Sequence, residues 1–205
     1  MRNRTALWWT PLLLVPAFLC PATPARSEVS TDDVPASAAS LSRRVLHNGD
    51  SLAVGTALYL RPALPGWAIR TSVDISRHAS EGPPVLRRLG SRLPRVIVMS
   101  LGTNDDPRAL GLFRRAIRST MRIAGPRRCV VWANIVRPPV AGAGYGAMNA
   151  LLAREAGRRR NLRLFNWVRM ARAHRGWFGP DRVHPSGVGY RARARGIAEE
   201  VRRCR

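Results

Sequence analysis

Two mostly apolar runs, at residues 95–101 and 129–135, constrain the fold of this chain most strongly. Continuous apolar runs of this length are typical of strands buried on both faces, as in parallel sheets covered by helices. Stretches with helical spacing of apolar residues lie between such runs, so strands and helices alternate along the chain. The sequence therefore predicts an α/β fold with a parallel sheet.

We predict five strands, at residues 45–48, 68–75, 95–101, 129–135 and 162–167, and helices at 51–60, 84–92, 107–123, 146–159 and 187–203. The first helix is expected to end before Pro62, because proline has no backbone N–H. In such sheets ligands bind outside the carboxyl ends of the strands. Functional residues are therefore expected directly after each strand.

The first 42 residues have the composition of a leader followed by a connection. Arg2 and Arg4 precede an apolar stretch at 6–19, and small residues follow it, so we predict a signal peptide over 1–27. An uncleaved anchor is the alternative. Residues 28–42 are small, polar and acidic, which predicts a flexible linker. One domain is expected over 43–205, as a monomer that is secreted or extracytoplasmic in the cell envelope.

The net charge of +23 comes from 35 basic residues, all of them arginine. The arginines are scattered and lack interleaved aromatic residues on which bases would stack, so no nucleic-acid partner is expected. A basic surface would still attract anionic polymers or lipid head groups, which predicts peripheral association with an anionic envelope.

The string Gly49-Asp50-Ser51-Leu52 lies between the first predicted strand and the first predicted helix. A serine at such a junction presents its hydroxyl at the carboxyl edge of the sheet. Its backbone N–H lies in the first turn of a helix, where partial positive charge can meet an oxyanion. Ser51 is therefore a candidate nucleophile, although the same string also forms ordinary turns.

Two later motifs follow the third and fifth predicted strands. Asn104, in Gly102-Thr103-Asn104-Asp105, is either a side-chain donor towards the crevice or a cap for the next helix. Asp181 and His184 are three residues apart, so the carboxylate can accept the Nδ1 proton and leave Nε2 to take a proton from Ser51. Among the other histidines, His78 is the main rival base and His47 is expected to be structural.

These three motifs, in this order, resemble the SGNH hydrolases, the GDSL-type esterases and acyl-transfer enzymes, across residues 43–203. The resemblance implies a flavodoxin-like three-layer α/β/α sandwich with strand order 2-1-3-4-5. It also implies that Ser51 is the nucleophile, His184 the base and Asp181 the acid that orients it. The oxyanion donors implied are the N–H of Ser51 and the side chain of Asn104. The chain is similar, too, to the SGNH domains appended to bacterial membrane O-acyltransferases.

One position departs from the pattern of that family. Arg77 stands after the second strand where the family usually has a glycine whose N–H is a third oxyanion donor. A backbone N–H survives this change, so Arg77 remains a candidate donor. Its side chain is expected to add bulk and positive charge at the mouth of the crevice.

The expected function is hydrolysis of acyl or acetyl esters through an acyl-serine intermediate, on an ester substrate of the cell envelope, polysaccharide or lipid. The alternatives are an O-acyltransferase or deacetylase acting on an envelope polysaccharide, and a non-catalytic binder of anionic envelope polymers. We expect no cofactor and no metal site, because the three cysteines and four histidines form no ligand cluster in the sequence.

Further residues have two open interpretations each. Cys129 and Cys204 would form a disulfide, or Cys129 would be a free buried thiol. Asn134 and Arg137, with the segment 141–146, would shape the pocket or form only a connection. The aromatic pair at 177–178 would line the site or pack beneath it.

Overall fold

The computed structural model describes residues 43–204, so the predicted signal peptide and linker lie outside the described residues. A parallel sheet of five strands has the order β2-β1-β3-β4-β5, which confirms the predicted topology. The strands are β1 (Arg44–Gly49), β2 (Ala68–Val73), β3 (Val96–Ser100), β4 (Cys129–Ala133) and β5 (Leu162–Phe165).

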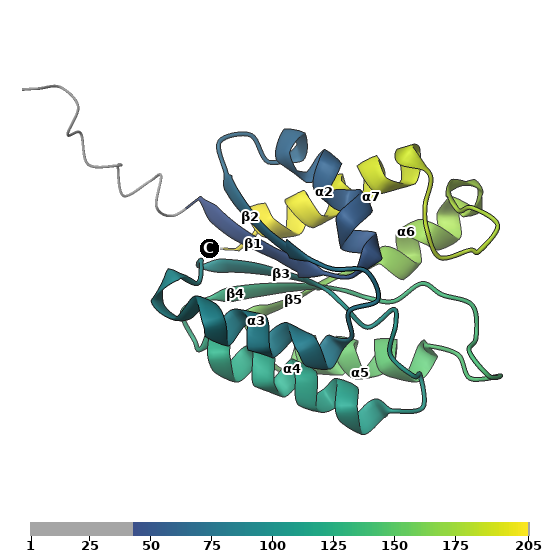
Figure 1. Ribbon diagram of the computed structural model, residues 1–205, viewed down its shortest axis with the longest axis horizontal. Coiled ribbons are helices and arrows are strands. Elements are labelled where there is room, and N and C mark those ends of the chain that lie inside the picture. The colour runs from purple at the N-terminus through teal and green to yellow at the C-terminus, as the bar shows by residue number, and fades with distance from the viewer. Residues whose placement is uncertain (1–42, 205) are drawn as a thin grey trace, which may run out of the picture. The chain divides into compact units, whose positions relative to one another are not determined.

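Helices cover both faces of this sheet, which gives three layers (Figure 1). On one face lie α3 (Gly82–Leu89), α4 (Leu110–Ala124) and α5 (Gly146–Gly157). On the other lie α2 (Ser51–Ala63), α6 (Trp167–Ala173) and α7 (Gly187–Arg202). Short 3₁₀ helices are η1 (Ala79–Glu81), η2 (Gly90–Arg92) and η3 (Arg175–Trp177).

Alternate residues of each central strand point into two separate cores. Ile97 and Met99 of β3 pack with the layer of α3, α4 and α5. Val96 and Val98 pack with the layer of α2, α6 and α7. Since successive side chains of a strand point to opposite faces, a strand covered on both sides must be apolar throughout. This explains the apolar runs from which the fold was predicted.

The helix boundaries correct two predictions. Helix α2 continues through Pro62 to Ala63, because a proline in the last turn removes only one hydrogen bond. The last strand ends at Phe165, and the unpredicted helix α6 begins at Trp167. The side chain of Asn166 caps α6 by accepting from the N–H of Arg169 at 3.0 Å, while Trp167 and Ala171 face the core.

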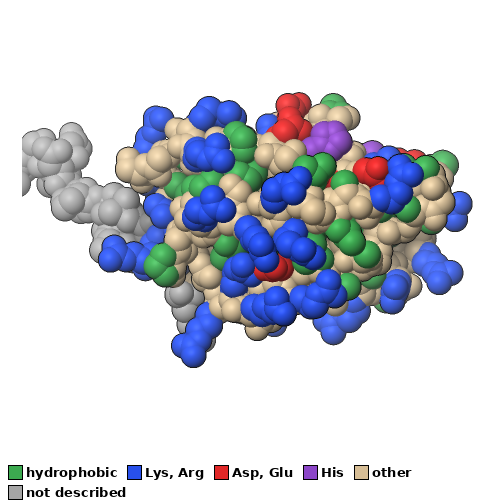
Figure 2. All heavy atoms as spheres, turned by 90° about the horizontal axis from the view of Figure 1, so that it is seen from below, with side chains coloured by type: hydrophobic (Ala, Val, Ile, Leu, Met, Phe, Trp, Pro, Cys, Tyr) green, Lys and Arg blue, Asp and Glu red, His purple; other side chains and the backbone are tan. Residues whose placement is uncertain are grey.

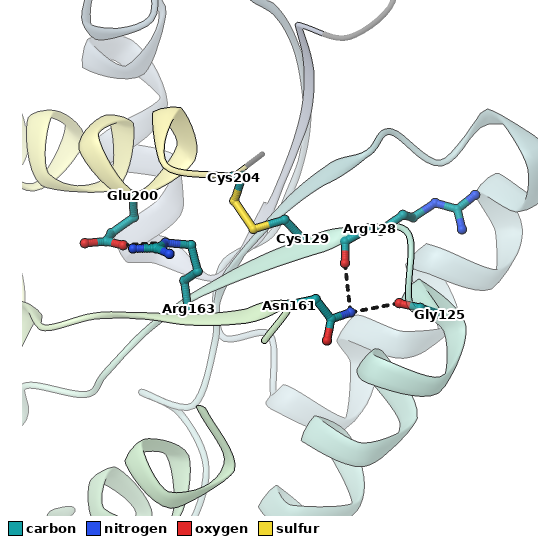
Figure 3. The surroundings of a disulfide bond; sticks show 7 residues. All are labelled: Gly125, Arg128, Cys129, Asn161, Arg163, Glu200 and Cys204. Carbon is teal, nitrogen blue, oxygen red and sulfur yellow. Dashed lines mark hydrogen bonds and ion pairs between the residues drawn. A yellow bond between two sulfur atoms is a disulfide. The ribbon is translucent and has the colours of Figure 1, made fainter. Parts of the chain in front are cut away.

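A disulfide joins Cys129 at the start of β4 to Cys204 after α7, with the two Cα atoms 5.7 Å apart (Figure 3). Of the two interpretations of these cysteines, the disulfide is therefore the correct one, and Cys129 is not a free thiol. Nearby, Arg163 of β5 pairs with Glu200 of α7 at 2.8 Å, so an ion pair joins α7 to the neighbouring strand as well. The disulfide fixes the end of the chain to the edge of the sheet opposite to the predicted site.

Seen from the side of α3, α4 and α5, basic side chains are distributed across the whole face among apolar and neutral groups (Figure 2). The absence of a nucleic-acid partner stays a prediction. Within residues 43–204, no helix combines the length and the apolarity needed to cross a membrane.

Candidate active site

The junction of β1 and α2 fixes the position of Ser51. A Cβ atom on Gly49 would lie 2.3 Å from the Ala53 Cβ and 2.8 Å from the Ser100 carbonyl oxygen, so only glycine fits there. The backbone N–H of Asp50 donates to the Ser100 carbonyl at 3.1 Å, and its carboxylate accepts from the N–H of Leu52 at 3.0 Å. Ser51 thus begins α2 with a backbone N–H that has no partner inside the helix.

Ser51, His184 and Asp181 form one hydrogen-bonded chain. The Ser51 Oγ lies 2.8 Å from His184 Nε2, and His184 Nδ1 lies 2.6 Å from Asp181 Oδ2. With the proton on Nδ1, the imidazole donates to the carboxylate and accepts from the hydroxyl. These are the contacts that abstraction of the serine proton requires. The structure thus brings together the three residues predicted for catalysis.

Asp181 is held as a carboxylate by the turn that carries the histidine. Its Oδ1 accepts from the backbone N–H groups of Val183, at 3.0 Å, and His184, at 3.1 Å. The hydrogen bond from the His184 ring, followed by these two N–H groups, lowers the pKa of Asp181 to about 2. Asp181 is therefore ionised at neutral pH and fixes both the tautomer and the orientation of the ring.

The three side chains open into a cavity of about 550 Å³, which we call the serine pocket. Its remaining walls come from the segments after β2, β3 and β4 and from the histidine turn: Ile75, Ser76, Asn104, Arg137, Pro138, Pro139, Val140 and Val183. The pocket thus lies at the carboxyl edge of the sheet, where the strand order predicts ligand binding.

Asn104 lines the serine pocket and does not cap a helix. The residue before α4 is Ala109, which makes no side-chain capping bond. The Asn104 Nδ2 donates to the Arg77 carbonyl at 3.4 Å, and its Oδ1 accepts from Arg137 at 3.3 Å. Because a guanidinium can only donate, the Asn104 amide oxygen must face Arg137. The amide nitrogen therefore points away from Arg137, to the side of the Arg77 carbonyl.

The side chain of Arg77 is turned into the protein, which corrects the expectation of bulk and charge at the crevice mouth. Its Nη1 donates to Asn48 Oδ1 at 2.8 Å and to the Ser72 carbonyl at 2.5 Å. The guanidinium satisfies these groups at the end of the sheet, and only 12% of the side chain is exposed. The role of the Arg77 N–H as a third oxyanion donor stays a prediction.

Together with its neighbour Ile75, Ser76 lines the serine pocket. Its φ is 65°, in the left-handed region that favours glycine. Its backbone N–H is therefore a further candidate oxyanion donor beside that of Arg77. Nothing in the residues 74–77 signals this conformation, because serine is common in turns of every type.

The other candidate residues lie elsewhere. His78 Nδ1 is 4.0 Å from Asp105 Oδ1, and His174 stacks on Trp177 with ring centroids 3.9 Å apart. Asn134 donates to Asn166 and accepts from the N–H of Val168, so it joins two connections. Trp177 packs on other aromatic side chains. Arg137 alone among the weaker candidates reaches the serine pocket.

A buried polar cluster lies next to the turn that carries Ser51, and sequence reasoning missed it. Arg193 of α7 is 1% exposed and donates to the Ser100 Oγ at 2.5 Å. Burial lowers its pKa to about 10 and raises the pKa of the neighbouring Asp50, against the opposing attraction between the two charges. Burial also lowers the pKa of His47 to about 3, so this histidine is neutral at physiological pH.

Within residues 43–204, no three or more His, Cys, Asp or Glu side chains gather as metal ligands would. The Asp181 and His184 side chains are already committed to each other and to Ser51. Together these side chains can activate the Ser51 hydroxyl, which lies at the N-terminus of α2.

No family model and no curated protein sequence matches this chain, but solved structures do. The C-terminal catalytic domain of peptidoglycan O-acetyltransferase A from Streptococcus pneumoniae superposes with a TM-score of 0.65 at 18% identity, over 80% of this chain and 92% of that one. A GDSL-like lipase from Bacteroides thetaiotaomicron gives 0.61 at 15%, over 80% and 90%.

The esterase EstA from a Pseudoalteromonas species gives a TM-score of 0.58 at 14% identity, over 78% of this chain and 97% of that one. Identities this low show the fold, and the roles of individual residues need their own tests. The residues from β1 to α7 therefore have the α/β/α fold of the SGNH or GDSL-type hydrolases, as the three motifs implied.

Proposed function

We propose that the protein is a secreted or extracytoplasmic serine esterase, which hydrolyses acyl esters, acetyl esters among them, through an acyl-serine intermediate. The observation that carries the proposal is the hydrogen-bonded chain from Ser51 through His184 to Asp181, open to the serine pocket. The fold shared with a lipase and an esterase supports it.

In the first half-reaction the Ser51 oxygen attacks the ester carbonyl carbon while its proton passes to His184 Nε2. The carbonyl oxygen becomes an oxyanion. When the tetrahedral intermediate collapses, the carbon–oxygen bond to the alcohol breaks and His184 returns its proton to the leaving oxygen. The acyl group remains on Ser51, and the Asp181 carboxylate stabilises the imidazolium in between.

We assign stabilisation of the oxyanion to donors at the carboxyl edge of the sheet. The Ser51 N–H at the start of α2 and the Asn104 amide are the first two. The third is a backbone N–H of the turn at Ser76 and Arg77. Removing one such donor typically lowers kcat about 10²–10³-fold.

In the second half-reaction a water molecule attacks the acyl-serine. His184 takes the proton of this water and then returns it to the Ser51 oxygen, which releases the carboxylic acid and restores the enzyme. His184 thus acts as the base in each half-reaction and as the acid that returns the proton.

The test compares the full chain with its Ser51→Ala variant on p-nitrophenyl esters of increasing acyl length. Ser51→Ala should lower kcat/KM by at least about 10³-fold, because the nucleophile is lost. Ser91→Ala, at an exposed position in η2 on the opposite edge of the sheet, is the matched control and should match wild type. Equal activity of wild type and Ser51→Ala would refute the assignment.

Acyl transfer to a carbohydrate hydroxyl is the second candidate, favoured by the similarity to the catalytic domain of a peptidoglycan O-acetyltransferase. The steps up to the acyl-serine are the same, and a sugar hydroxyl replaces water in the second half-reaction. Mass spectrometry of reactions that contain a carbohydrate acceptor separates an acylated sugar from free carboxylic acid.

A non-catalytic binder of anionic envelope polymers is the alternative from another class. Such a protein would turn over no ester, and its binding would be sensitive to salt and unchanged by Ser51→Ala.

The proposed location outside the cytoplasm is supported by the disulfide, because such bonds persist in oxidising compartments.

A further inference from the structure

A second cavity, of about 420 Å³, lies beside the serine pocket and shares Arg137 with it. Four arginines line it: Arg137, Arg172, Arg175 and Arg182. No carboxylate does so within the described part of the chain. We call this cavity the arginine pocket.

The neutral polar groups of the arginine pocket are already satisfied within the protein. The Tyr145 hydroxyl donates to the backbone carbonyls of Thr103, at 3.2 Å, and Asp105, at 2.9 Å. The Asn149 side chain donates to the Ile135 carbonyl and accepts from its N–H, both at 2.8 Å. A ligand would therefore meet few free donors other than the guanidinium groups.

Three of the four guanidinium groups are free in this structure. Arg172, Arg175 and Arg182 are exposed and make no side-chain hydrogen bond or ion pair with any residue between 43 and 204. Arg137 uses one nitrogen, Nη1, for the Thr103 carbonyl and Asn104 Oδ1. Its remaining N–H groups are available, since a guanidinium has five.

The N-terminus of helix α5 adds positive potential to the same cavity. Gly146, the first residue of α5, lines the pocket, and the preceding Tyr145 makes no side-chain capping bond. The first-turn N–H groups of this 12-residue helix are thus without a side-chain cap. Free guanidinium groups, an uncapped helix N-terminus and the absence of a carboxylate all favour an anion.

We propose that the arginine pocket binds an anionic group, a carboxylate or a phosphate, on the alcohol side of the ester that Ser51 cleaves. This inference rests on the proposed esterase function. The side is set by proton transfer, because the leaving oxygen must lie next to His184 Nε2 to take its proton. The turn that carries His184 also carries Arg182, which reaches the arginine pocket.

Arg137 connects the arginine pocket to the serine pocket, because it lines both. Its guanidinium contacts Asn104, the proposed oxyanion donor, and also lines the arginine pocket. An anion bound there would lie on the opposite side of Arg137 from the reacting carbonyl. The apolar wall formed by Val168 and Phe178 offers contact to the uncharged part of the alcohol.

The kinetic test uses 4-acetoxybenzoate and its neutral amide, 4-acetoxybenzamide, which differ in the charge on the alcohol side. Wild type should show a larger kcat/KM for the anionic ester, mainly through a lower KM, and the preference should fall as salt is added. 4-Acetoxyphenyl phosphate distinguishes a phosphate from a carboxylate.

The variant is Arg172→Met combined with Arg175→Met, which leaves Arg137 and the histidine turn in place. The ratio of kcat/KM for the anionic over the neutral ester should fall about fivefold for each arginine removed. The matched control combines Arg118→Met and Arg122→Met on the exposed face of α4 and should keep the wild-type ratio.

Three results would overturn the proposal. One is a wild-type enzyme without preference for the anionic alcohol. Another is an equal fall of the ratio in both double variants, which would mean general attraction by the net charge. The third is a preference confined to an anionic acyl group, seen with p-nitrophenyl hemisuccinate against p-nitrophenyl butanoate.

A binding measurement separates this proposal from the esterase function. Calorimetry with the Ser51→Ala variant should detect a trimer of galacturonic acid more strongly than a neutral galactose trimer. Adding Arg172→Met and Arg175→Met should remove the difference, and the α4 changes should not. If Ser51→Ala hydrolyses esters like wild type but this binding pattern holds, the esterase proposal fails and the anion site stands. If the binding pattern is lost while hydrolysis still depends on Ser51, the anion-site proposal fails and the esterase proposal stands.

Discussion

Asp181→Asn removes one negative charge from the proposed catalytic chain and keeps the shape of the side chain. In wild type both carboxylate oxygens accept hydrogen bonds. Oδ2 accepts from His184 Nδ1 at 2.6 Å, and Oδ1 accepts from the N–H groups of Val183 and His184. An asparagine has only one acceptor atom for these three donors.

Each orientation of the new amide harms the reaction. If the amide nitrogen faces His184, the ring must accept at Nδ1 and carry its proton on Nε2, where it can no longer take the proton of Ser51. If the amide oxygen faces the ring, the amide nitrogen meets two backbone N–H donors, and the turn must move. Both orientations also leave the imidazolium without a countercharge.

The expected loss is about 10⁴-fold in kcat, the size found when the corresponding aspartate of a serine protease is replaced by asparagine. KM should change little, because Asp181 acts through His184 on the transition state. The fold should survive, since Asp181 lies on an exposed turn. Thermal unfolding followed by circular dichroism checks this.

The assay is hydrolysis of p-nitrophenyl acetate under saturating conditions, with Asp106→Asn as the matched control. Asp106 is also exposed and accepts from a backbone N–H two residues later, that of Arg108, so the chemical change is the same away from the serine pocket. Asp106→Asn should keep the wild-type kcat. A folded Asp181→Asn enzyme with more than about a tenth of wild-type kcat would refute the tautomer argument.

The pH profile supplies an independent check. The lowered pKa of Asp181 means that its interaction with His184 is present above the ordinary carboxyl value and is lost only as the pH falls through about 2. Between about pH 5 and pH 8, the ionisation of Asp181 should therefore contribute nothing to the pH dependence of the wild-type rate. A second ionisation on the acid side of this window would contradict the assigned state of Asp181.

Two further predictions concern stability. Cys204→Ser should lower the free energy of unfolding by about 4 kcal/mol, because the disulfide spans 75 residues of the chain. Urea unfolding measures this, and a midpoint equal to that of oxidised wild type would refute it. His47 is buried with a lowered pKa, so the unfolded chain binds a proton that the folded chain does not between pH 6.5 and about 3. Wild type should lose stability as the pH falls through that window, and His47→Leu should lose less. Urea midpoints measured across the window with equal slopes for both proteins would show that the reasoning is wrong.

The sheet was predictable because its cause is local. A strand covered on both faces must be apolar at every position, and two such runs with helical spacing between them fix a parallel sheet. Helix α6 was missed because Trp167 reads equally well as the end of an apolar strand. Only the Asn166 cap and the packing of Trp167 beneath η3 decide for a helix, and these are tertiary contacts.

The position of the serine pocket was predictable for a related reason. Ser51 and Asn104 directly follow strands, and parallel strands deliver their following residues to one edge of the sheet. The direction of Arg77 was not predictable, because its partners Asn48 and Ser72 belong to two different strands. A long side chain with many rotamers takes whichever acceptors the fold offers.

Arg193 shows the limit of reasoning from residue type. It lies between Arg191 and Arg195, which resemble it in sequence, and composition alone places all three in solvent. The helical period instead puts Arg193 on the buried side of α7, with Gly189 and Ile197. The attraction of the Asp50 carboxylate opposes the effect of burial on the pKa of Arg193, so the acid that caps α2 also helps to keep the buried arginine charged.

The positions of the aspartates say more about where the functional site lies than the net charge does. Within residues 43–204 every aspartate follows a strand or lies in the histidine turn, and none lies on the outer face of a helix. Asp50 caps α2, Asp105 accepts from the N–H of Ala79, and Asp181 holds His184. Arginines on solvent faces can be exchanged for other polar residues with little effect on the fold. A carboxylate that accepts defined hydrogen bonds at the carboxyl edge of the sheet cannot be exchanged in this way, so the aspartates point to this edge as the place of function.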